Sequence, residues 1–331
     1  MSSRIVMAMT DLPFKGEYWS KLEAIVSPDR LIAVDPQNER GIAEALQQAE
    51  IAILPADLDD RHIAAPKLKW VHANHAGITK SARPEVFEKG LIVTGAAGRS
   101  APALAEHAMM FMLVLCSNYP AFYEAQKRHQ WGGIPGQGNL RALYGRTVGI
   151  IGMGFTGMEL ATRCKAFGMH VLGYRRRDLP APPGVDRMYA ADKGEGIDEI
   201  LRESDIIAMV INLSDKTRHM IGANEFARMK SSAIIVNLAR GPVIDEKAML
   251  EALRSGRIAG AGLDVFDQEP LPADNPLWDA PNTLITPHSS APVRDRLERT
   301  LAILAENFRR YRAGEPMLNR ISEEDVYTAA E

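Results

Sequence analysis

The stretch TVGIIGMGFTG, residues 147–157, decides the class of fold. A short apolar run, 147–151, is followed by three glycines with the spacing G-x-G-x-x-G, and then by a helical pattern over 158–167. A strand, a glycine-rich turn and a helix in this order open a βαβ unit, in which helices connect parallel strands. The stretch therefore predicts a parallel sheet covered by helices.

The same alternation of apolar runs and helical patterns fills the rest of the chain. Further strands are predicted at 4–9, 31–34, 51–54, 69–73, 91–94, 170–174, 206–210, 233–237, 260–264 and 283–286. We predict an α/β protein with two doubly wound parallel-sheet domains. A Rossmann cofactor domain, 99–288, is inserted in a flavodoxin-like substrate domain made of 1–98 and 289–331. Ser100 is the expected N-cap of a long helix, with Pro102 in its first turn.

Composition excludes several classes of protein. The 331 residues are 46% hydrophobic and 24% charged, with a net charge of −3, which is typical of a globular protein without a nucleic-acid or membrane partner. Cys116 and Cys164 lie far apart in apolar patterns, and therefore predict buried thiols in a reducing compartment. No signal peptide is recognisable, and the apolar run 108–116 is too short to span a bilayer. We expect a cytoplasmic protein.

Each glycine of the loop has a physical task in binding a dinucleotide. Gly152 allows the tight turn, Gly154 lets the backbone approach a pyrophosphate, and Gly157 allows close packing of the helix. Amide groups at the helix N-terminus then bind the phosphates. The alternative is an ordinary glycine turn in an α/β protein.

The end of the next strand indicates which dinucleotide binds. NAD-selective folds place a carboxylate there, but this strand ends in Arg175-Arg176-Arg177, and the first carboxylate is Asp178. Guanidinium groups suit a 2′-phosphate, because they bind phosphate oxygens in pairs. We predict NADP(H) as the preferred cofactor and NAD(H) as the alternative. A solvated basic loop is the competing interpretation.

Arg240, Glu269 and His288 are the candidate catalytic residues, since each follows a predicted strand. An Arg suits a substrate carboxylate, a His suits proton transfer near neutral pH, and a carboxylate orients the imidazole and favours its protonated form. This set is suited to reduction of a 2-oxo acid. Singly, each also has a structural interpretation as a strand cap, a turn or a loop residue.

In several segments the chain resembles the D-isomer-specific 2-hydroxyacid dehydrogenases. The segments are AGITKSARPEVFEKGLIVTGAAG (76–98), ALAEH (103–107), the glycine loop, 237–278 and TPHSSA (286–291). The resemblance implies that Arg240 binds the substrate carboxylate and carbonyl, and that His288, paired with Glu269, is the general acid for reduction. It also implies that amides near Ala76 and Gly77 bind the substrate carboxylate. Further implied cofactor contacts are Phe155, Thr156, Thr217, Ala239 and Asp264, of which Asp264 holds the nicotinamide amide.

The predicted function is NAD(P)H-dependent reduction of a small 2-oxo acid to the D-2-hydroxy acid. The compact length and the arginine cluster favour glyoxylate or hydroxypyruvate with NADPH, and the resemblance implies a homodimer in which the apolar helix 101–116 makes contact. Glu269 argues against formate as the substrate. The alternatives are a dinucleotide-sensing binding protein of corepressor type and a dehydrogenase for another 2-hydroxy acid. Phosphite oxidation is disfavoured, because that branch of the family has a Lys in the loop 74–77.

Two pairs of residues invite stronger interpretations than the sequence supports. His72 and His75 point to different faces of a strand, so no metal site is predicted. Glu106 and His107 resemble an acid–base pair, but adjacent helical residues do not face each other, so packing is the expected role.

Overall fold

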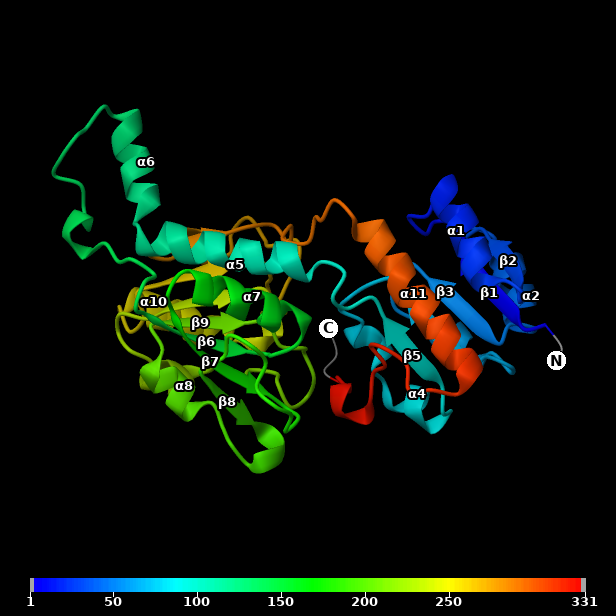
Figure 1. The fold of residues 1–331 in the computed structure, drawn as a ribbon. Helices are drawn as coiled ribbons and strands as arrows, with labels where there is room; N and C mark the ends of the chain where they lie inside the picture. Colours follow the sequence, from blue (N-terminus) through cyan, green and yellow to red (C-terminus); the bar gives the residue numbers. More distant parts are fainter. Residues whose placement is uncertain (1–2, 329–331) are drawn as a thin grey trace. The chain divides into compact units, whose positions relative to one another are not determined.

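The computed structural model describes residues 3–328, which form two compact units. The first unit comprises the chain up to Arg99, Ser214–Lys216 and the chain from Val293 onward, and the second comprises Ser100–Leu213 and Thr217–Pro292. Each unit is built on one parallel sheet with helices on both faces (Figure 1), which confirms the predicted fold class. The second unit ends four residues beyond the predicted boundary at residue 288.

The first unit has a five-stranded sheet in the order β2-β1-β3-β4-β5, which is the flavodoxin-like order. Its strands are β1 (Ile5–Met9), β2 (Arg30–Val34), β3 (Ile51–Leu54), β4 (Trp70–Ala73) and β5 (Ile92–Gly95). Its helices are α1 (Glu17–Val26), α2 (Glu39–Leu46), α3 (Asp60–Ala64), α4 (Pro84–Glu88) and α11 (Arg296–Ala313). Side chains alternate across the sheet, so Val6 and Trp70 pack with α1 and α11, whereas Met7 and Val71 pack on the opposite face with α2 and α4.

The second unit has a seven-stranded parallel sheet in the order β12-β11-β10-β9-β6-β7-β8. Its strands are β6 (Thr147–Ile151), β7 (His170–Arg175), β8 (Arg187–Ala190), β9 (Ile206–Met209), β10 (Ile234–Asn237), β11 (Gly260–Leu263) and β12 (Thr283–Ile285). The order reverses between β6 and β9, which is the Rossmann switch point. Strand β8 was not predicted, because its short sequence RMYA lacks an apolar run.

Helices cover both faces of this sheet. Helices α5 (Ala101–Cys116) and α7 (Phe155–Ala166) share one apolar core with Val148 and Ile150 of β6. On the other face α8 (Asp198–Glu203) lies so close to β6 that a Cβ at Gly149 would be 2.3 Å from the Ile200 side chain. Two further helices of this unit are α9 (Ala223–Arg228) and α10 (Glu246–Arg254).

Helix α5 begins differently from the prediction. Ser100 occupies the N-cap position, but its hydroxyl caps no backbone amide. Its backbone (φ −113°, ψ 8°) departs from the extended conformation that aims a capping hydroxyl at the first turn. Within residues 3–328, no helix is both long and apolar enough to cross a membrane.

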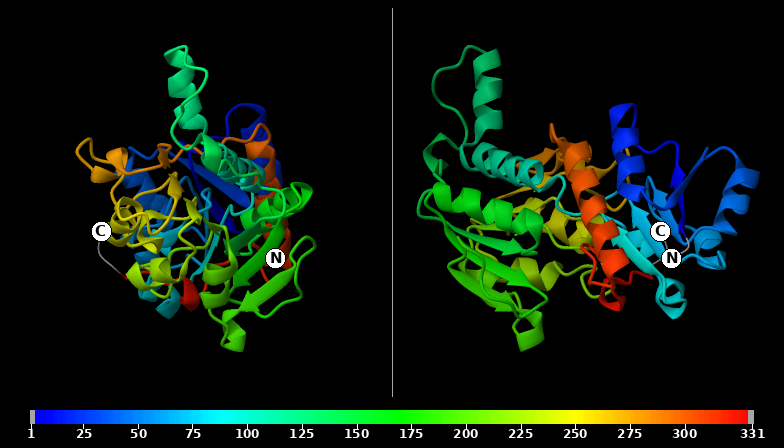
Figure 2. Two further views of the ribbon diagram at one scale, coloured as in Figure 1. Left: turned by 90° about the vertical axis from the view of Figure 1, so that its left-hand side faces the viewer. Right: turned by 45° about the vertical axis from the view of Figure 1, so that its right-hand side comes forward.

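An arm projects from the second unit after α5 (Figures 1 and 2). It contains α6 (Tyr119–Lys127) and the 3-10 turn Gln137–Asn139. Large apolar side chains are exposed along and next to the arm, namely Tyr119, Tyr123, Trp131, Leu140 and Tyr144. Trp131 is 98% exposed, so nothing within its own chain covers it.

Candidate active site

The glycine loop has the geometry of a phosphate-binding turn. Gly152 has a φ of +110°, and a Cβ there would lie 2.5 Å from the Val210 carbonyl oxygen. A Cβ at Gly157 would lie 2.3 Å from the Gly152 carbonyl oxygen, so the first turn of α7 packs directly on the loop. Gly154 and Phe155 are exposed at the start of α7, and Thr156 is half-buried. The helix N-terminus is therefore accessible to an anion.

The arginine cluster after β7 divides into two roles. The Arg175 guanidinium donates hydrogen bonds to the carbonyl oxygens of Arg177 (3.0 Å) and Pro180 (2.9 Å), and to that of Leu179. Arg175 therefore shapes its own loop, which the sequence did not predict. Arg177 is exposed and Arg176 is half-buried. Because both side chains reach solvent, Arg176 and Arg177 remain candidates for the predicted phosphate contact.

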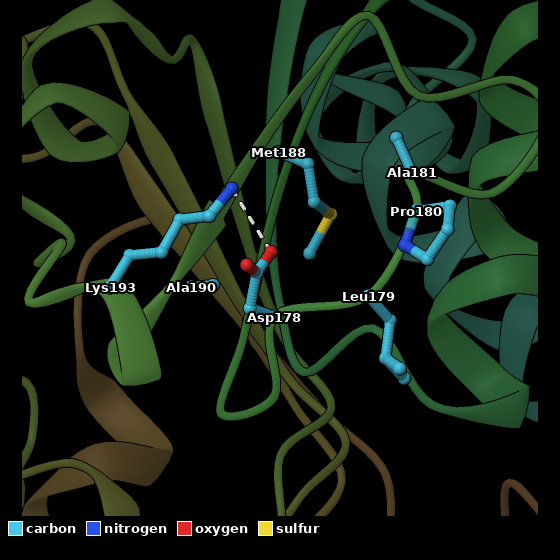
Figure 3. Close-up of a pocket in the computed structure, with 7 residues that line it drawn as sticks. All are labelled: Asp178, Leu179, Pro180, Ala181, Met188, Ala190 and Lys193. Carbon is cyan, nitrogen blue, oxygen red and sulfur yellow. Dashed lines mark ion pairs between the residues drawn. The ribbon is translucent and has the colours of Figure 1, made fainter.

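The first carboxylate after β7 is already paired. Asp178 forms an ion pair of 3.0 Å with Lys193, which follows β8 (Figure 3). The pair lies at one side of a pocket of about 450 Å³, whose other lining residues are Leu179, Pro180, Ala181, Met188 and Ala190. Both side chains of this pair are about half exposed, so Asp178 is engaged by Lys193 while staying in contact with solvent.

Glu269 and His288 form the predicted pair. His288 Nδ1 lies 2.7 Å from Glu269 Oε2, while Glu269 Oε1 accepts a hydrogen bond of 3.0 Å from the Phe266 amide. Both side chains are partly exposed, at 43% and 34%, so the pair is reachable from solvent. Because Nδ1 faces the carboxylate, Nε2 is the nitrogen that is left to meet a substrate.

The charges around this pair tune its protonation. The hydrogen bond to Glu269 raises the pKa of His288 above its ordinary value, although burial and the charge of Arg240 oppose this shift. Burial alone would raise the pKa of Glu269, but the hydrogen bonds from His288 and the Phe266 amide outweigh it and lower that pKa. Arg240 also lowers the pKa of Glu269, so its guanidinium lies within electrostatic reach of both residues. The pair thus favours imidazolium beside carboxylate near neutral pH.

Close backbone contacts join the loop of Arg240 to the loop of Glu269, although the two loops follow different strands. Asn237, at the end of β10, accepts from the Ala239 amide (3.0 Å) and donates to the Arg240 carbonyl (3.1 Å). Ala239 is buried, and its carbonyl accepts from the Arg240 guanidinium at 2.7 Å. Gly241 then packs so tightly that a Cβ would lie 1.9 Å from the Phe266 carbonyl carbon. This contact holds the loop of Arg240 against the loop of Glu269.

Asp264 organises the loop that carries His288. Its carboxylate is fully buried and accepts from the Thr286 hydroxyl (2.5 Å), the Ser289 amide (2.9 Å) and the Ser290 amide (3.2 Å). His288 has a φ of +47°, which is disfavoured for a residue with a side chain and is found at functional sites. Holding this loop is a role that the sequence did not suggest for Asp264, and the nicotinamide contact stays a prediction.

The predicted substrate loop belongs to the first unit, after β4. Ala76 is exposed and Gly77 is half-buried, and the Gly77 amide lies 3.3 Å from the His75 ring nitrogen. The loop is braced by Arg99, whose guanidinium donates to the Asn74 carbonyl (2.7 Å) and side-chain oxygen (3.3 Å). Arg99 is only 4% exposed, and its burial lowers its pKa to about 10.

Two remaining predictions concern Thr217 and metals. The Thr217 hydroxyl donates to the Asn212 carbonyl at 2.7 Å, so it fixes the turn after β9. Across residues 3–328, no group of three or more His, Cys, Asp or Glu side chains is arranged to hold a metal ion.

A Rossmann sheet, a dinucleotide loop and an acid–base pair in one unit define a dinucleotide-dependent oxidoreductase. Residues 109–290 match the model of the D-isomer specific 2-hydroxyacid dehydrogenase NAD binding domain. The glyoxylate reductase of Korarchaeum cryptofilum is 32% identical over 329 residues, which cover 97% of this chain and 96% of that protein. The chain therefore belongs to the D-isomer specific 2-hydroxyacid dehydrogenase family, which confirms the predicted family and enzyme class.

Two further comparisons delimit this similarity. The D-3-phosphoglycerate dehydrogenase of Methanocaldococcus jannaschii is 39% identical over 251 residues, which cover 76% of this chain and 47% of that protein. The present chain thus spans about half the length of that relative. A solved structure of a D-isomer specific 2-hydroxyacid dehydrogenase from Xanthobacter autotrophicus Py2, in complex with NADPH and MES, has a TM-score of 0.81 at 27% identity. That match covers 97% of this chain and 99% of the other.

Proposed function

We propose that this protein reduces a small 2-oxo acid to the D-2-hydroxy acid with NADPH, and that glyoxylate or hydroxypyruvate is the substrate. The observation that carries the proposal is the 2.7 Å contact between His288 and Glu269, with the charge of Arg240 acting on both. The name of the Korarchaeum cryptofilum relative, glyoxylate reductase, supports the choice of a small substrate.

The residues divide the reaction between them. NADPH, when bound at the glycine loop, would supply the hydride to the carbonyl carbon. Arg240 binds the substrate carboxylate and polarises the carbonyl, because its guanidinium stays charged and presents paired donors. His288 donates the proton on Nε2 to the carbonyl oxygen as the alcohol forms. Glu269 holds the ring by Nδ1 and stabilises the imidazolium until that proton leaves.

Steady-state oxidation of NADPH and NADH against a panel of 2-oxo acids tests the proposal. The panel contains glyoxylate, hydroxypyruvate, pyruvate, 2-ketogluconate and phenylpyruvate. We expect the highest kcat/KM with glyoxylate or hydroxypyruvate. Preference for a bulky acid would indicate a dehydrogenase for another 2-hydroxy acid. NADPH binding without turnover of any panel member would favour the dinucleotide-sensing binding protein.

We infer a preference for NADPH over NADH from the loop after β7. The support is the pairing of Asp178 with Lys193 and the positions of Arg176 and Arg177. The double variant Arg176→Ser/Arg177→Ser should lower the NADPH-to-NADH ratio of kcat/KM by about 10- to 100-fold, because charged hydrogen bonds to the phosphate are lost. Asp178→Asn serves as the control and should leave the ratio within about twofold. An unchanged ratio in the double variant would overturn the inference.

We also propose a homodimer formed through the second unit. Met110 and Leu113 are exposed on α5, and exposed aromatic side chains continue onto the arm. Apolar side chains of this kind are enriched in subunit interfaces. Sedimentation should therefore give a dimer, and Trp131→Ser/Tyr123→Ser should weaken it, whereas a wild-type monomer at micromolar concentration would contradict the proposal. A cytoplasmic location stays a prediction from the sequence.

A further inference from the structure

A row of hydrogen-bonded polar side chains, part-buried at His107 and Thr286 and fully buried at Asp264, connects helix α5 to the loop that carries His288. His107 Nε2 lies 2.9 Å from the Thr286 hydroxyl oxygen, and that hydroxyl lies 2.5 Å from Asp264 Oδ1. The His107 side chain is 16% exposed and Asp264 is fully buried. The proton transfer proposed above uses no atom of His107 or Thr286, so the row needs another explanation.

The direction of each hydrogen bond follows from counting protons. The Thr286 hydroxyl has one proton, and the carboxylate of Asp264 can only accept, so this proton goes to Asp264. The hydroxyl oxygen must then accept from His107, whose Nε2 therefore carries the proton. Burial lowers the pKa of His107, although the charge of Asp264 opposes the shift, so the ring is neutral at neutral pH.

Asp264 anchors the loop on both sides of His288. Its carboxylate accepts the amides of Ser289 and Ser290, and its backbone carbonyl accepts the His288 amide at 3.0 Å. His288 keeps a left-handed backbone only while these contacts hold, because this conformation is unfavourable for a residue with a Cβ. The orientation of the Asp264 carboxylate thus fixes the backbone from which the His288 side chain extends toward Glu269.

Packing fixes the position of His107 relative to that carboxylate. The Phe111 ring, one turn further along α5, meets the His107 ring edge-on at 4.8 Å between centroids. Phe111 in turn packs on Gly262 of β11, where a Cβ would lie 2.6 Å from its ring. Strand β11 ends at Leu263, directly before Asp264. Strand β11 therefore fixes both the position of His107 on α5 and the start of the loop that contains Asp264.

We propose that His107 is a positioning residue for His288. His107 donates a hydrogen bond to the Thr286 hydroxyl and so orients this hydroxyl to donate its own hydrogen bond to Asp264. Asp264 then holds the strained loop in its productive geometry. The expected packing role of His107 is extended by a hydrogen-bonding role. The catalytic part of this inference rests on the proposed reductase function.

Two matched pairs of variants test the proposal. His107→Phe keeps an aromatic ring but removes the donor, whereas His107→Gln places an amide donor at a similar reach. Thr286→Val removes the hydroxyl with little change in volume, and Thr286→Ser keeps it. We expect kcat and kcat/KM to fall together by about 10- to 100-fold in His107→Phe and Thr286→Val, because small displacements of a reacting group have effects of this size. The Gln and Ser variants should stay within about threefold of wild type.

Amide hydrogen exchange of the peptide 286–291, measured without substrate, gives a second readout. We expect faster exchange in His107→Phe and Thr286→Val than in their conservative partners, with global unfolding temperatures recorded for all four variants. If His107→Phe does not fold, the Thr286 pair carries the test. Equal kcat values and equal exchange within each pair would overturn the proposal. If the wild type reduces no 2-oxo acid, the proposed function fails, and the exchange result alone decides whether His107 holds the loop.

Discussion

Two loops at the carboxyl ends of strands carry the predicted chemistry, and the fold braces them with opposite charges. The loop after β4, residues 74–77, is held by the buried cation of Arg99, which binds backbone and side-chain oxygens of Asn74. The loop after β12, residues 286–290, is held by the buried anion of Asp264, which binds amides and a hydroxyl. Each loop is thus held by a single ionisable side chain that is at most 4% exposed.

The difference matches the charge that each loop is predicted to meet. A cation beneath the first loop favours the substrate carboxylate that Ala76 and Gly77 are expected to bind. An anion beside the second loop favours the imidazolium of His288, and the charge of Asp264 contributes to the raised pKa of that residue. Arg99 and Asp264 therefore each hold the backbone of a loop and also favour the charge that this loop is predicted to meet.

Replacing His288 should have the largest effect. His288→Asn removes the proton donor from the second loop and should lower kcat for reduction by about 10²- to 10⁴-fold, the usual contribution of a general acid. Fluorescence titration should give an NADPH dissociation constant close to that of the wild type. Near-wild-type turnover would show that another group supplies the proton.

Removing the buried charge of Arg99, which holds the first loop, should have an intermediate effect, and on KM rather than on kcat. Arg99→Gln removes the buried charge, so we expect KM for the 2-oxo acid to rise roughly tenfold while kcat changes less. Arg99→Lys, which keeps the charge, is the control and should recover part of the loss. A fall in kcat with unchanged KM would place Arg99 outside substrate binding.

Removing only the longer hydrogen bond of Arg99, to the Asn74 side chain, should have the smallest effect. Asn74→Ala deletes the side-chain oxygen at 3.3 Å but keeps the carbonyl at 2.7 Å. We expect KM to rise about threefold, because a long hydrogen bond contributes little. A rise as large as that of Arg99→Gln would mean that the side chain, rather than the backbone, orients the guanidinium.

The sequence predicted the parts of the molecule that repeat a local pattern. Short apolar runs marked most strands, and Arg240, Glu269 and His288 were proposed because each follows such a run. Strand β8 was not predicted because its four residues have no strand pattern of their own. It is a strand because it pairs with β7. Membership of the dehydrogenase family confirmed the predicted oxidoreductase class.

Contacts between residues distant in sequence could not be predicted. His107 and Thr286 are 179 residues apart, so spacing gave no sign that their side chains meet. The sequence likewise showed three arginines after β7 but not that Arg175 turns back onto its own loop. Left-handed backbone at His288 had no signal either, since no glycine occupies the position.

The pH dependence of kcat/KM for reduction, in wild type and Glu269→Gln, tests the central claim most directly. Reduction needs protonated His288, so the rate falls as pH rises through the pKa of that residue. Since Glu269 raises this pKa above its ordinary value, the wild-type rate should persist to higher pH, and the fall in Glu269→Gln should move to lower pH. Glu246→Gln, which removes a nearby carboxylate bonded to the Asp267 amide, should keep the wild-type profile. Superimposable profiles for wild type and Glu269→Gln would contradict the assignment of this pair as the proton donor.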